Sequence, residues 1–214
     1  MSALDWDSLP PLRDVISNHN LRAEKKFGQN FLLDGNLTDK IARQAGDLSD
    51  KIAFEIGPGP GGLTRSLLKA GAKKVIAIEL DPRAVTALGD LKEFAGDKLE
   101  IISADALETD LTTLAPDDKR VIVANLPYNV ATPLLINWLR QIRVHPDAYD
   151  AMVLMFQKEV GNRIRAKPNT KAYGRLSVLS QWLCDVRNCF DLPPSAFTPP
   201  PKIKSSVVHF VPKT

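Results

Sequence analysis

Cysteine and histidine are scarce in this sequence: its 214 residues include 2 cysteines and 3 histidines. Cys184 and Cys189 form no CxxC pair, and no histidine lies close to them in the sequence. We therefore interpret them as small buried hydrophobic side chains rather than as a disulfide or metal ligands. His19, His145 and His209 are scattered along the chain. Because a metal site needs several ligands close together, the sequence predicts no metal centre.

Long apolar runs and targeting segments are also missing. No stretch approaches the roughly 20 apolar residues that a membrane-spanning helix requires. Residues 1–7 contain no basic segment followed by an apolar one, which excludes a typical secretory signal, and they are too acidic for a transit peptide. These absences make a cytoplasmic protein with no membrane partner our expectation.

Positive charge is concentrated in one segment. The net charge is only +3, yet residues 156–175 contain six basic residues and one acid and carry +5. A basic surface on a nearly neutral body is typical of proteins that bind nucleic acid, although such segments also occur as solvated helices and loops. The residues that we predict to contact nucleic-acid phosphates are Lys25, Lys26, Arg163, Arg165, Lys167, Lys171 and Arg175.

Short apolar runs alternate with helical patterns along most of the chain. Strands that are apolar throughout and alternate with helices predict a parallel sheet covered on both faces. Two further strands near the end are joined by a proline-rich loop too short for a parallel crossover, so we expect them to pair antiparallel. The predicted strands span residues 52–56, 75–78, 99–102, 121–124, 151–155, 185–190 and 206–211, and the predicted helices span residues 11–19, 63–70, 82–94 and 134–142.

The first predicted strand runs into a loop rich in glycine and proline, EIGPGPGGLT at residues 55–64. In an α/β sheet, ligands bind at this position, beside the carboxyl ends of the strands. Gly57, Gly59 and Gly62 match the GxGxxG pattern of dinucleotide sites, and Glu79 lies at about the distance expected for an acid that binds ribose. The pattern alone does not distinguish NAD from another adenosine-containing cofactor, and a turn without a ligand is a third interpretation.

Two details of this loop favour a cationic cofactor over a dinucleotide. Glu55 would repel a pyrophosphate but suits a sulfonium and an amino group, and Pro58 and Pro60 remove two N–H donors from any phosphate cradle. Asp105 follows the third strand, as Glu79 follows the second, and it would accept a hydrogen bond from an adenine amino group. Three acids at the ends of three consecutive strands therefore predict a site for S-adenosylmethionine on one edge of the sheet.

The tetrapeptide Asn125-Leu126-Pro127-Tyr128 directly follows the fourth strand and so lies on the same edge. An exocyclic adenine amine is a weak nucleophile because its lone pair is delocalised into the ring. It becomes more reactive when the Asn125 side-chain oxygen and the Leu126 carbonyl oxygen, with a ψ restricted by Pro127, accept its two hydrogens. The Tyr128 ring then holds the base flat. Without the upstream loop, a proline turn would be the simpler interpretation; with the loop, we predict adenine-N6 methylation.

These segments together resemble the KsgA-type family of 16S rRNA adenine N6,N6-dimethyltransferases. The resemblance covers nearly the whole chain. The extended motif NLPYNVATP is typical of this family, whereas related large-subunit rRNA methyltransferases usually have Asn-Ile-Pro-Tyr. The family implies a Rossmann-like, class I S-adenosylmethionine-dependent α/β fold: a seven-stranded, mostly parallel sheet with the last strand antiparallel and helices on both faces. The matching segments are residues 9–13, 28–34, 55–64, 79–81, 125–133, 156–160, 172–178 and 197–202.

The resemblance also implies roles for individual residues. The N-terminal segment would close over the cofactor, the glycine loop would contact it through its backbone, and the acids would bind its ribose and adenine. Asn125 would touch both cofactor and target, with Tyr128 on one face of the target base and Phe197 on the other. The implied cofactor-binding residues are Gln29, Asn30, Leu32, Glu55, Gly57, Gly59, Glu79, Asp105, Ala106 and Asn125, and the implied catalytic residues are Asn125, Leu126, Pro127, Tyr128 and Phe197.

The resemblance further implies the substrate. Members transfer four methyl groups, two to each of two adjacent adenosines in a hairpin near the 3′ end of 16S rRNA, within an immature 30S subunit, and we expect a monomer. Residues 1–35 would form an N-terminal helix and capping segment and residues 36–214 the methyltransferase domain, with the usual small C-terminal helical domain absent. Two alternatives stay open: a ribosome-assembly factor in which methylation is secondary, and a related 23S rRNA adenine methyltransferase. Glu55 and residues 125–128 disfavour a nicotinamide dehydrogenase.

Overall fold

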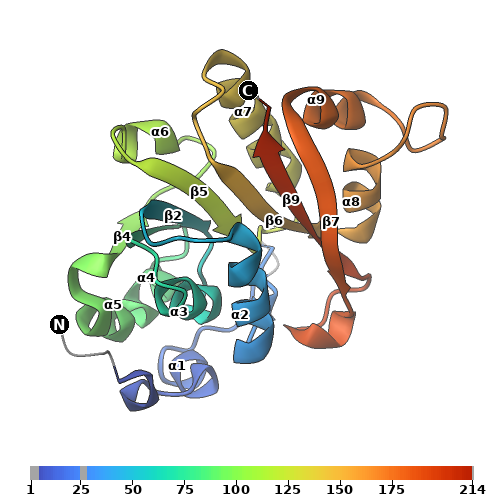
Figure 1. Cartoon of the computed structure of the whole chain (residues 1–214). Coiled ribbons are helices and arrows are strands. Elements are labelled where there is room, and N and C mark those ends of the chain that lie inside the picture. Colours follow the sequence, from blue (N-terminus) through green and yellow to red (C-terminus); the bar gives the residue numbers. More distant parts are fainter. Residues whose placement is uncertain (1–4, 25–27, 214) are drawn as a thin grey trace.

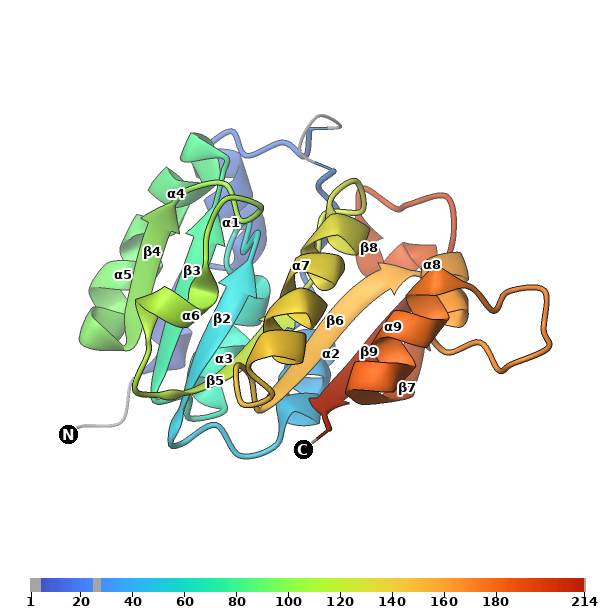
Figure 2. The same cartoon turned by 90° about the horizontal axis from the view of Figure 1, so that it is seen from above.

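Within residues 5–24 and 28–213, which the computed structural model describes, a seven-stranded sheet crosses the molecule with helices on both faces (Figures 1 and 2). The strands lie in the order β4-β3-β2-β5-β6-β9-β7. Their bounds are β2 Lys51–Ile56, β3 Lys74–Glu79, β4 Leu99–Ser103, β5 Lys119–Ala124, β6 Ala151–Gln157, β7 Cys184–Leu192 and β9 Ser205–Pro212.

Within this sheet, β9 runs against the strands on both sides of it. Strands β4, β3, β2, β5 and β6 pair parallel to one another. Strand β9 is inserted between β6 and β7 and pairs antiparallel with both. The predicted mostly parallel sheet and the antiparallel pairing of the last two strands are thus confirmed. The strand order reverses between β2 and β5, which is where open α/β sheets bind ligands at their carboxyl ends.

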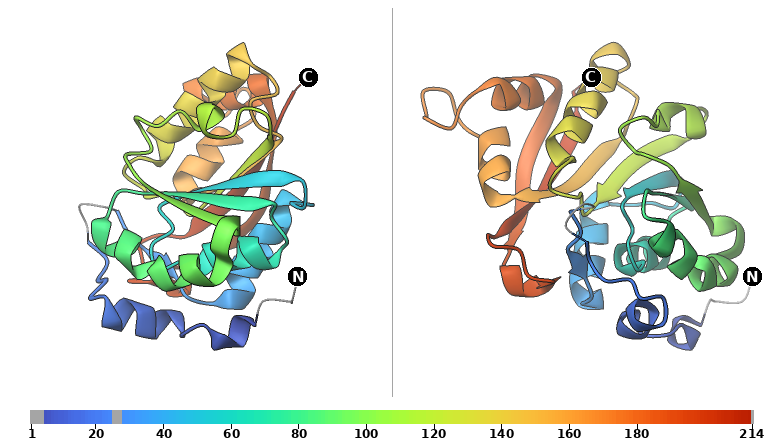
Figure 3. Two further views of the ribbon diagram at one scale, coloured as in Figure 1. Left: turned by 90° about the vertical axis from the view of Figure 1, so that its left-hand side faces the viewer. Right: turned by 180° about the vertical axis from the view of Figure 1, so that it is seen from behind.

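The side chains of each central strand pack into two hydrophobic cores, because successive residues of a strand point to opposite faces of the sheet. On β2, Phe54 packs into the core under α7, whereas Ala53 packs into the core under α2 and α3. Figure 3 shows these layers from the side, and α1 lies outside them, where Val15 packs near Ala84 of α4. The helices are α1 Leu12–Asn18, α2 Gly35–Ala42, α3 Gly62–Lys69, α4 Pro82–Ala87, α5 Gly89–Ala95, α6 Leu111–Leu114, α7 Ala131–Val144, α8 Lys158–Ile164 and α9 Arg175–Leu183, and the 3-10 turns are η1 Trp6–Ser8, η3 Arg43–Ala45, η4 Gly96–Lys98 and η5 Pro194–Ala196.

The helices differ from the sequence-based expectation in two ways. The helix predicted over residues 82–94 is divided into α4 and α5 at Leu88, which is fully buried. Glycine is a poor helix former, so Gly89 helps to separate the two. The short helices α2, α6, α8 and α9 were not predicted, whereas the equally short α1 and α3 were, since Pro10-Pro11 precedes α1 and Gly71 follows α3. Two of these helices begin at an aspartate that caps the N-terminus. Asp34 accepts a hydrogen bond from the Asn36 N–H at the start of α2, and Asp110 caps α6 in the same way.

A two-stranded sheet ties the N-terminal segment to the C-terminal part of the chain. Strand β1 Phe31–Leu32 pairs antiparallel with β8 Phe197–Thr198, with Leu32 opposite Phe197. Both short strands lie close to the carboxyl ends of the parallel strands (Figure 2). The segment before α2 is therefore held against the edge of the sheet that carries the predicted site. Of the helices in the described part of the chain, none is long and apolar enough to cross a membrane.

Candidate active site

An open pocket lies at the carboxyl ends of β2, β3, β4 and β5. Every residue that we predicted to bind the cofactor lines it, together with residues 125–128. The lining residues are 28–32, 55–60, 62–63, 78–80, 104–106 and 125–130. Five segments that are far apart in the sequence therefore converge on one cavity.

The glycine loop makes room for two different neighbours. Gly57 has φ of +66°, and a Cβ there would lie 3.4 Å from the Pro127 ring. Gly59 also has positive φ, but its Cβ would lie 2.9 Å from the Phe31 ring. A Cβ on Gly62 would lie 2.6 Å from the Leu32 carbonyl oxygen. Two of the three motif glycines thus leave room for the N-terminal segment, whereas Gly57 is favoured by its positive φ, so the motif packs protein as well as facing a ligand.

Glu55 is a buried acid with a fixed carboxylate. Only 2% of it is exposed, and its Oε2 accepts a hydrogen bond from Thr64 Oγ1 at 2.6 Å. Burial raises the pKa of Glu55 to about 8; the Thr64 hydrogen bond opposes this, and the nearby Glu79 adds to it. A cationic ligand beside this group would favour its ionised form.

Glu79 is held by the main chain on both carboxylate oxygens. Oε2 accepts from the Gly59 N–H at 3.1 Å, and Oε1 accepts from the Asp81 N–H at 2.9 Å. Burial raises the pKa of this carboxyl, and the two backbone hydrogen bonds lower it. The carboxylate is thus fixed in orientation, and each oxygen has lone pairs left for two adjacent hydroxyl groups. Asp105 is fixed similarly, since its Oδ1 accepts from the Leu107 N–H at 2.8 Å.

The turn after β5, residues 125–128, is anchored from two sides. Asn125 Nδ2 donates to the main-chain carbonyl oxygen of Asn30 at 2.8 Å, which leaves Asn125 Oδ1 as an acceptor. The Tyr128 hydroxyl group lies 2.5 Å from Ser205 Oγ. Burial raises the pKa of Tyr128 and the Ser205 contact lowers it, with a net rise, so the phenol keeps its proton at neutral pH. Leu126, only 1% exposed, fixes the turn between them in the core.

A group of hydrogen bonds and ion pairs holds the N-terminal segment over the pocket. These contacts were not predicted from the sequence. Gln29 Nε2 donates to Asp81 Oδ2 at 3.0 Å, and Gln29 Oε1 accepts from the Glu24 N–H at 3.0 Å. Arg83 contacts the Asp81 carboxylate at 2.7 Å and the Glu24 carboxylate at 2.7 Å. Burial opposes ionisation of Asp81, but hydrogen bonds from Arg83 and Gln29 hold its pKa below the usual value. Asp81 lies in one of the segments that match the family, but its partner Gln29 is 52 residues away in the sequence.

Phe197 and the basic segment do not lie in the pocket. Phe197 is 3% exposed and packs in the core opposite Leu32, so neither ring face is open to a base in this conformation. Its stacking role stays a prediction. Lys25 and Lys26 lie outside the described residues.

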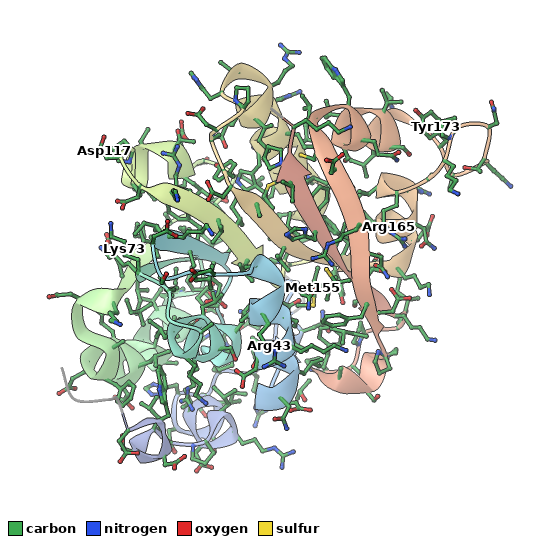
Figure 4. The ribbon with its side chains drawn as sticks, in the orientation of Figure 1. Arg43, Lys73, Asp117, Met155, Arg165 and Tyr173 are labelled. Carbon is green, nitrogen blue, oxygen red and sulfur yellow. The ribbon has the colours of Figure 1, made fainter. Side chains whose placement is uncertain are left out.

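The basic segment forms α8 and a loop that projects from the body, with Tyr173 on it (Figure 4). Lys158 and Arg163 are paired with Asp191 and Glu159, respectively. Arg165 Nη2 donates to Asn162 Oδ1 at 3.0 Å. For Lys167, Lys171 and Arg175, no ion pair forms within residues 28–213. The free positive charge of the segment is therefore concentrated in the loop and at the start of α9.

The fold and the pocket define a class I methyltransferase, and comparisons with solved structures agree. The chain resembles a dimethyladenosine transferase from Plasmodium falciparum with a TM-score of 0.73 and 34% identity, over 84% of this chain and 62% of that one. The 23S rRNA methyltransferase ErmE has the same fold, with a TM-score of 0.72 and 24% identity, over 86% of this chain and 70% of that one.

The sequence comparisons are more specific. The family model "Ribosomal RNA adenine dimethylase" matches residues 20–214. A protein of Allorhizobium ampelinum named "Ribosomal RNA small subunit methyltransferase A" is 57% identical over 213 residues, which cover 100% of this chain and 76% of that protein. One of the same name from Rhodospirillum rubrum is 56% identical, over 97% of this chain and 70% of that protein. The chain belongs to the ribosomal RNA adenine dimethylase family.

Proposed function

We propose that this protein transfers methyl groups from S-adenosylmethionine to the N6 amines of two adjacent adenosines in a hairpin near the 3′ end of 16S rRNA. It acts as a monomer on an immature 30S subunit in the cytoplasm. Family membership supports the reaction class, and the names of relatives at 54–57% identity favour the small over the large subunit. The observation that carries the proposal is Asn125, whose side-chain oxygen is left as an acceptor on the same rim as Glu55 and Glu79.

The donor set of the pocket fits S-adenosylmethionine. Glu79 offers two oxygens for a ribose diol, and Asp105 offers an acceptor for an adenine amine. Glu55 is a buried acid that a cationic methionine moiety would ionise, and Gly57 leaves open backbone beside Pro127. A pyrophosphate would instead meet two buried acids and a loop with two prolines. When bound, the cofactor supplies an electrophilic methyl group on a sulfonium.

The residues after β5 then raise the reactivity of the target amine. Asn125 Oδ1 and the Leu126 carbonyl oxygen accept its two hydrogens and draw the nitrogen toward a tetrahedral geometry. The Tyr128 ring holds the base against this pair of acceptors. The amine loses its proton only after methyl transfer has begun, when that proton is already acidic, so no strong base is required. The rate enhancement comes mainly from positioning for in-line attack.

The N-terminal segment and the basic loop complete the proposal. Residues 1–35 cap the cofactor, with Gln29, Asn30 and Leu32 at the pocket, while residues 36–214 form the methyltransferase domain. The loop that carries Lys167 and Lys171 binds rRNA phosphates, with Arg163, Arg165 and Arg175 around it and Lys25 and Lys26 at the N-terminal segment. Phosphate contacts of this kind position a nucleic acid without reading its sequence.

A methyl-transfer assay on immature 30S subunits, with the modified nucleotides mapped, tests the proposal. We expect N6,N6-dimethyladenosine at two adjacent positions near the 3′ end of 16S rRNA. Calorimetric titration should show binding of S-adenosylmethionine and none of NAD. Methylation confined to 23S rRNA, or NAD binding without S-adenosylmethionine binding, would overturn it.

A further inference from the structure

Tyr128 and Ser205 meet although 77 residues separate them in the sequence. The Tyr128 hydroxyl group and Ser205 Oγ lie 2.5 Å apart. Ser205 is the first residue of β9, is fully buried, and lies between Gln157 of β6 and Leu192 of β7. The far end of the Tyr128 ring is therefore fixed to the central sheet rather than to a loop.

We propose that Ser205 is a positioning residue for methyl transfer: its hydroxyl group fixes the Tyr128 ring as the wall against which the target adenine lies. This inference rests on the proposed function. The hydroxyl oxygen of a tyrosine lies at the far end of the ring, and its position is set by the first side-chain torsion, which has three staggered wells. Tyr128 is held at both ends, by the main chain of the turn after β5 and by Ser205. Supporting hydrogen bonds of this kind keep an active-site group within the narrow range of productive orientations.

The strand that carries Ser205 is itself braced. Asp191 of the neighbouring strand β7 pairs with Lys158 Nζ of α8 at 2.6 Å. The Lys158 N–H donates to the Lys204 carbonyl oxygen at 2.9 Å. These contacts join β9, β7 and α8 directly behind Ser205. The anchor for Tyr128 is thus a rigid point of the fold.

The chemistry of Tyr128 agrees with a positional role. Burial raises the pKa of the phenol, with the Ser205 contact acting in the opposite direction, so the hydroxyl group stays protonated at neutral pH. A protonated phenol does not act as a base for the amine. The hydroxyl group contributes its hydrogen bond with Ser205. Removal of either partner should therefore lower the rate of methyl transfer to the same extent.

The test compares Ser205→Ala with Ser206→Ala and Tyr128→Phe in the full chain. Ser206 is a matched control: it has the same residue type, strand and full burial, but its side chain lies on the opposite face of β9 and bonds to Asp191. Methyl transfer to immature 30S subunits is measured under single turnover, with the Kd for S-adenosylmethionine and the Tm measured in parallel.

We expect Ser205→Ala to lower the rate of methyl transfer about tenfold while the cofactor Kd changes less than about twofold. Tyr128→Phe should give a similar loss, and the double variant should be no slower than either single variant, because both remove one interaction. Ser206→Ala should keep the wild-type rate. The inference fails if Ser205→Ala transfers methyl groups at the wild-type rate, if Ser206→Ala is equally slow, or if the two losses multiply in the double variant. Absence of methyl transfer by the wild-type chain would instead refute the proposed function itself.

Discussion

Asn125 donates a hydrogen bond from its side-chain Nδ2 to the main-chain carbonyl oxygen of Asn30, at 2.8 Å. The bond joins the turn proposed to hold the target amine to the segment proposed to cover the cofactor. Because the amino side of the amide is committed to Asn30, Oδ1 is the side left for a ligand. The acceptor is therefore oriented before substrate arrives, and the orientation depends on a segment 95 residues away in the sequence.

Asn125→Asp is expected to lower the single-turnover rate of methyl transfer at least about 100-fold. A carboxylate cannot donate to the Asn30 carbonyl oxygen, so the side chain loses its fixed orientation, and its negative charge faces a carbonyl. The Kd for S-adenosylmethionine and the rate are both measured. Asn137→Asp, on α7 and outside the cofactor pocket, introduces the same charge and should leave the rate within about threefold. A rate for Asn125→Asp close to the wild-type value would contradict the proposed role.

Glu79→Ala is expected to weaken S-adenosylmethionine binding at least about tenfold. The change removes the proposed ribose acceptor and also leaves the Gly59 and Asp81 N–H groups without their carboxylate. Calorimetric titration measures the loss, with Glu93→Ala, an exposed residue of α5, as the control. If Glu79→Ala binds S-adenosylmethionine with wild-type affinity, Glu79 is not the residue that binds the ribose.

The same variant separates catalysis from ribosome assembly. Cells that depend on Glu79→Ala should contain 16S rRNA without dimethyladenosine. If 30S subunits nevertheless mature at the normal rate, binding of the protein is sufficient for assembly and methylation is secondary. If maturation stalls together with methylation, the catalytic step itself is required. Sedimentation profiles and mapping of the modified nucleotides give both results from one culture.

Glu55 should make cofactor affinity depend on pH. Burial raises its pKa to about 8, against the hydrogen bond from Thr64 and with the help of nearby Glu79. A cationic ligand binds the ionised form, so binding below pH 8 must release a proton. We expect the Kd for S-adenosylmethionine to fall as the pH rises from about 6.5 to about 8.5. Calorimetry in buffers of different ionisation enthalpy should detect release of up to one proton at neutral pH.

The stability of the folded protein should depend on pH in the opposite direction to its cofactor affinity. Because the pKa of Glu55 in the folded protein lies above its ordinary value of 4.5, the folded state binds more protons than the unfolded chain between that value and about 8. The free energy of unfolding therefore falls as the pH rises through this window. Glu55→Gln should raise the Tm at pH 8 by roughly 5 °C and remove the pH dependence of binding. An unchanged pH dependence would assign the titration to Glu79, whose pKa burial also raises.

The sheet and most of the pocket could be predicted because their signals are local. The strand that ends at Ile56 is mostly apolar and runs directly into the glycine loop, Glu79 is the last residue of β3, and Asp105 comes shortly after β4. In a parallel sheet, positions just after strands must share one edge, so local patterns suffice to bring them together. The short helix α8 gave no such signal, since a helix of two turns has almost no period to detect.

The contacts that complete the site could not be predicted, because they join segments with no shared pattern. The partner of Tyr128 is a serine in a strand 77 residues later, and nothing in either segment indicates the other. The resemblance implies that Phe197 stacks on the target base, which stays a prediction, and nothing in its segment indicates that the ring packs in the core opposite Leu32 in this structure. Register and side-chain direction are set by tertiary packing, which the sequence pattern does not contain.

Gln29→Ala should speed release of the cofactor. The side chain joins Asp81 to the Glu24 N–H, and its loss removes two hydrogen bonds that hold the N-terminal segment over the pocket. We expect the dissociation rate of S-adenosylmethionine to rise about fivefold and amide hydrogen exchange to increase at residues 28–33. Gln44→Ala is the control, since Gln44 lies outside the cofactor pocket and its side chain bonds to Lys40 and Arg187 instead. Unchanged dissociation and exchange in Gln29→Ala would show that β1 and the Asn125–Asn30 hydrogen bond suffice to hold the segment.

The projecting loop between α8 and α9 should account for much of the salt dependence of RNA binding. Lys167 and Lys171 are not neutralised by an ion pair within residues 28–213, unlike Lys158, which pairs with Asp191. Replacing both with Gln should weaken binding to immature 30S subunits and reduce the slope of log K against log salt by about 1.5, the value for two lost phosphate contacts. The matched control replaces Lys92 and Lys98, which lie near β4 at the opposite edge of the sheet, and should leave the slope unchanged. Equal slopes for the loop variant and the wild-type protein would mean that this positive charge serves only to solvate the surface.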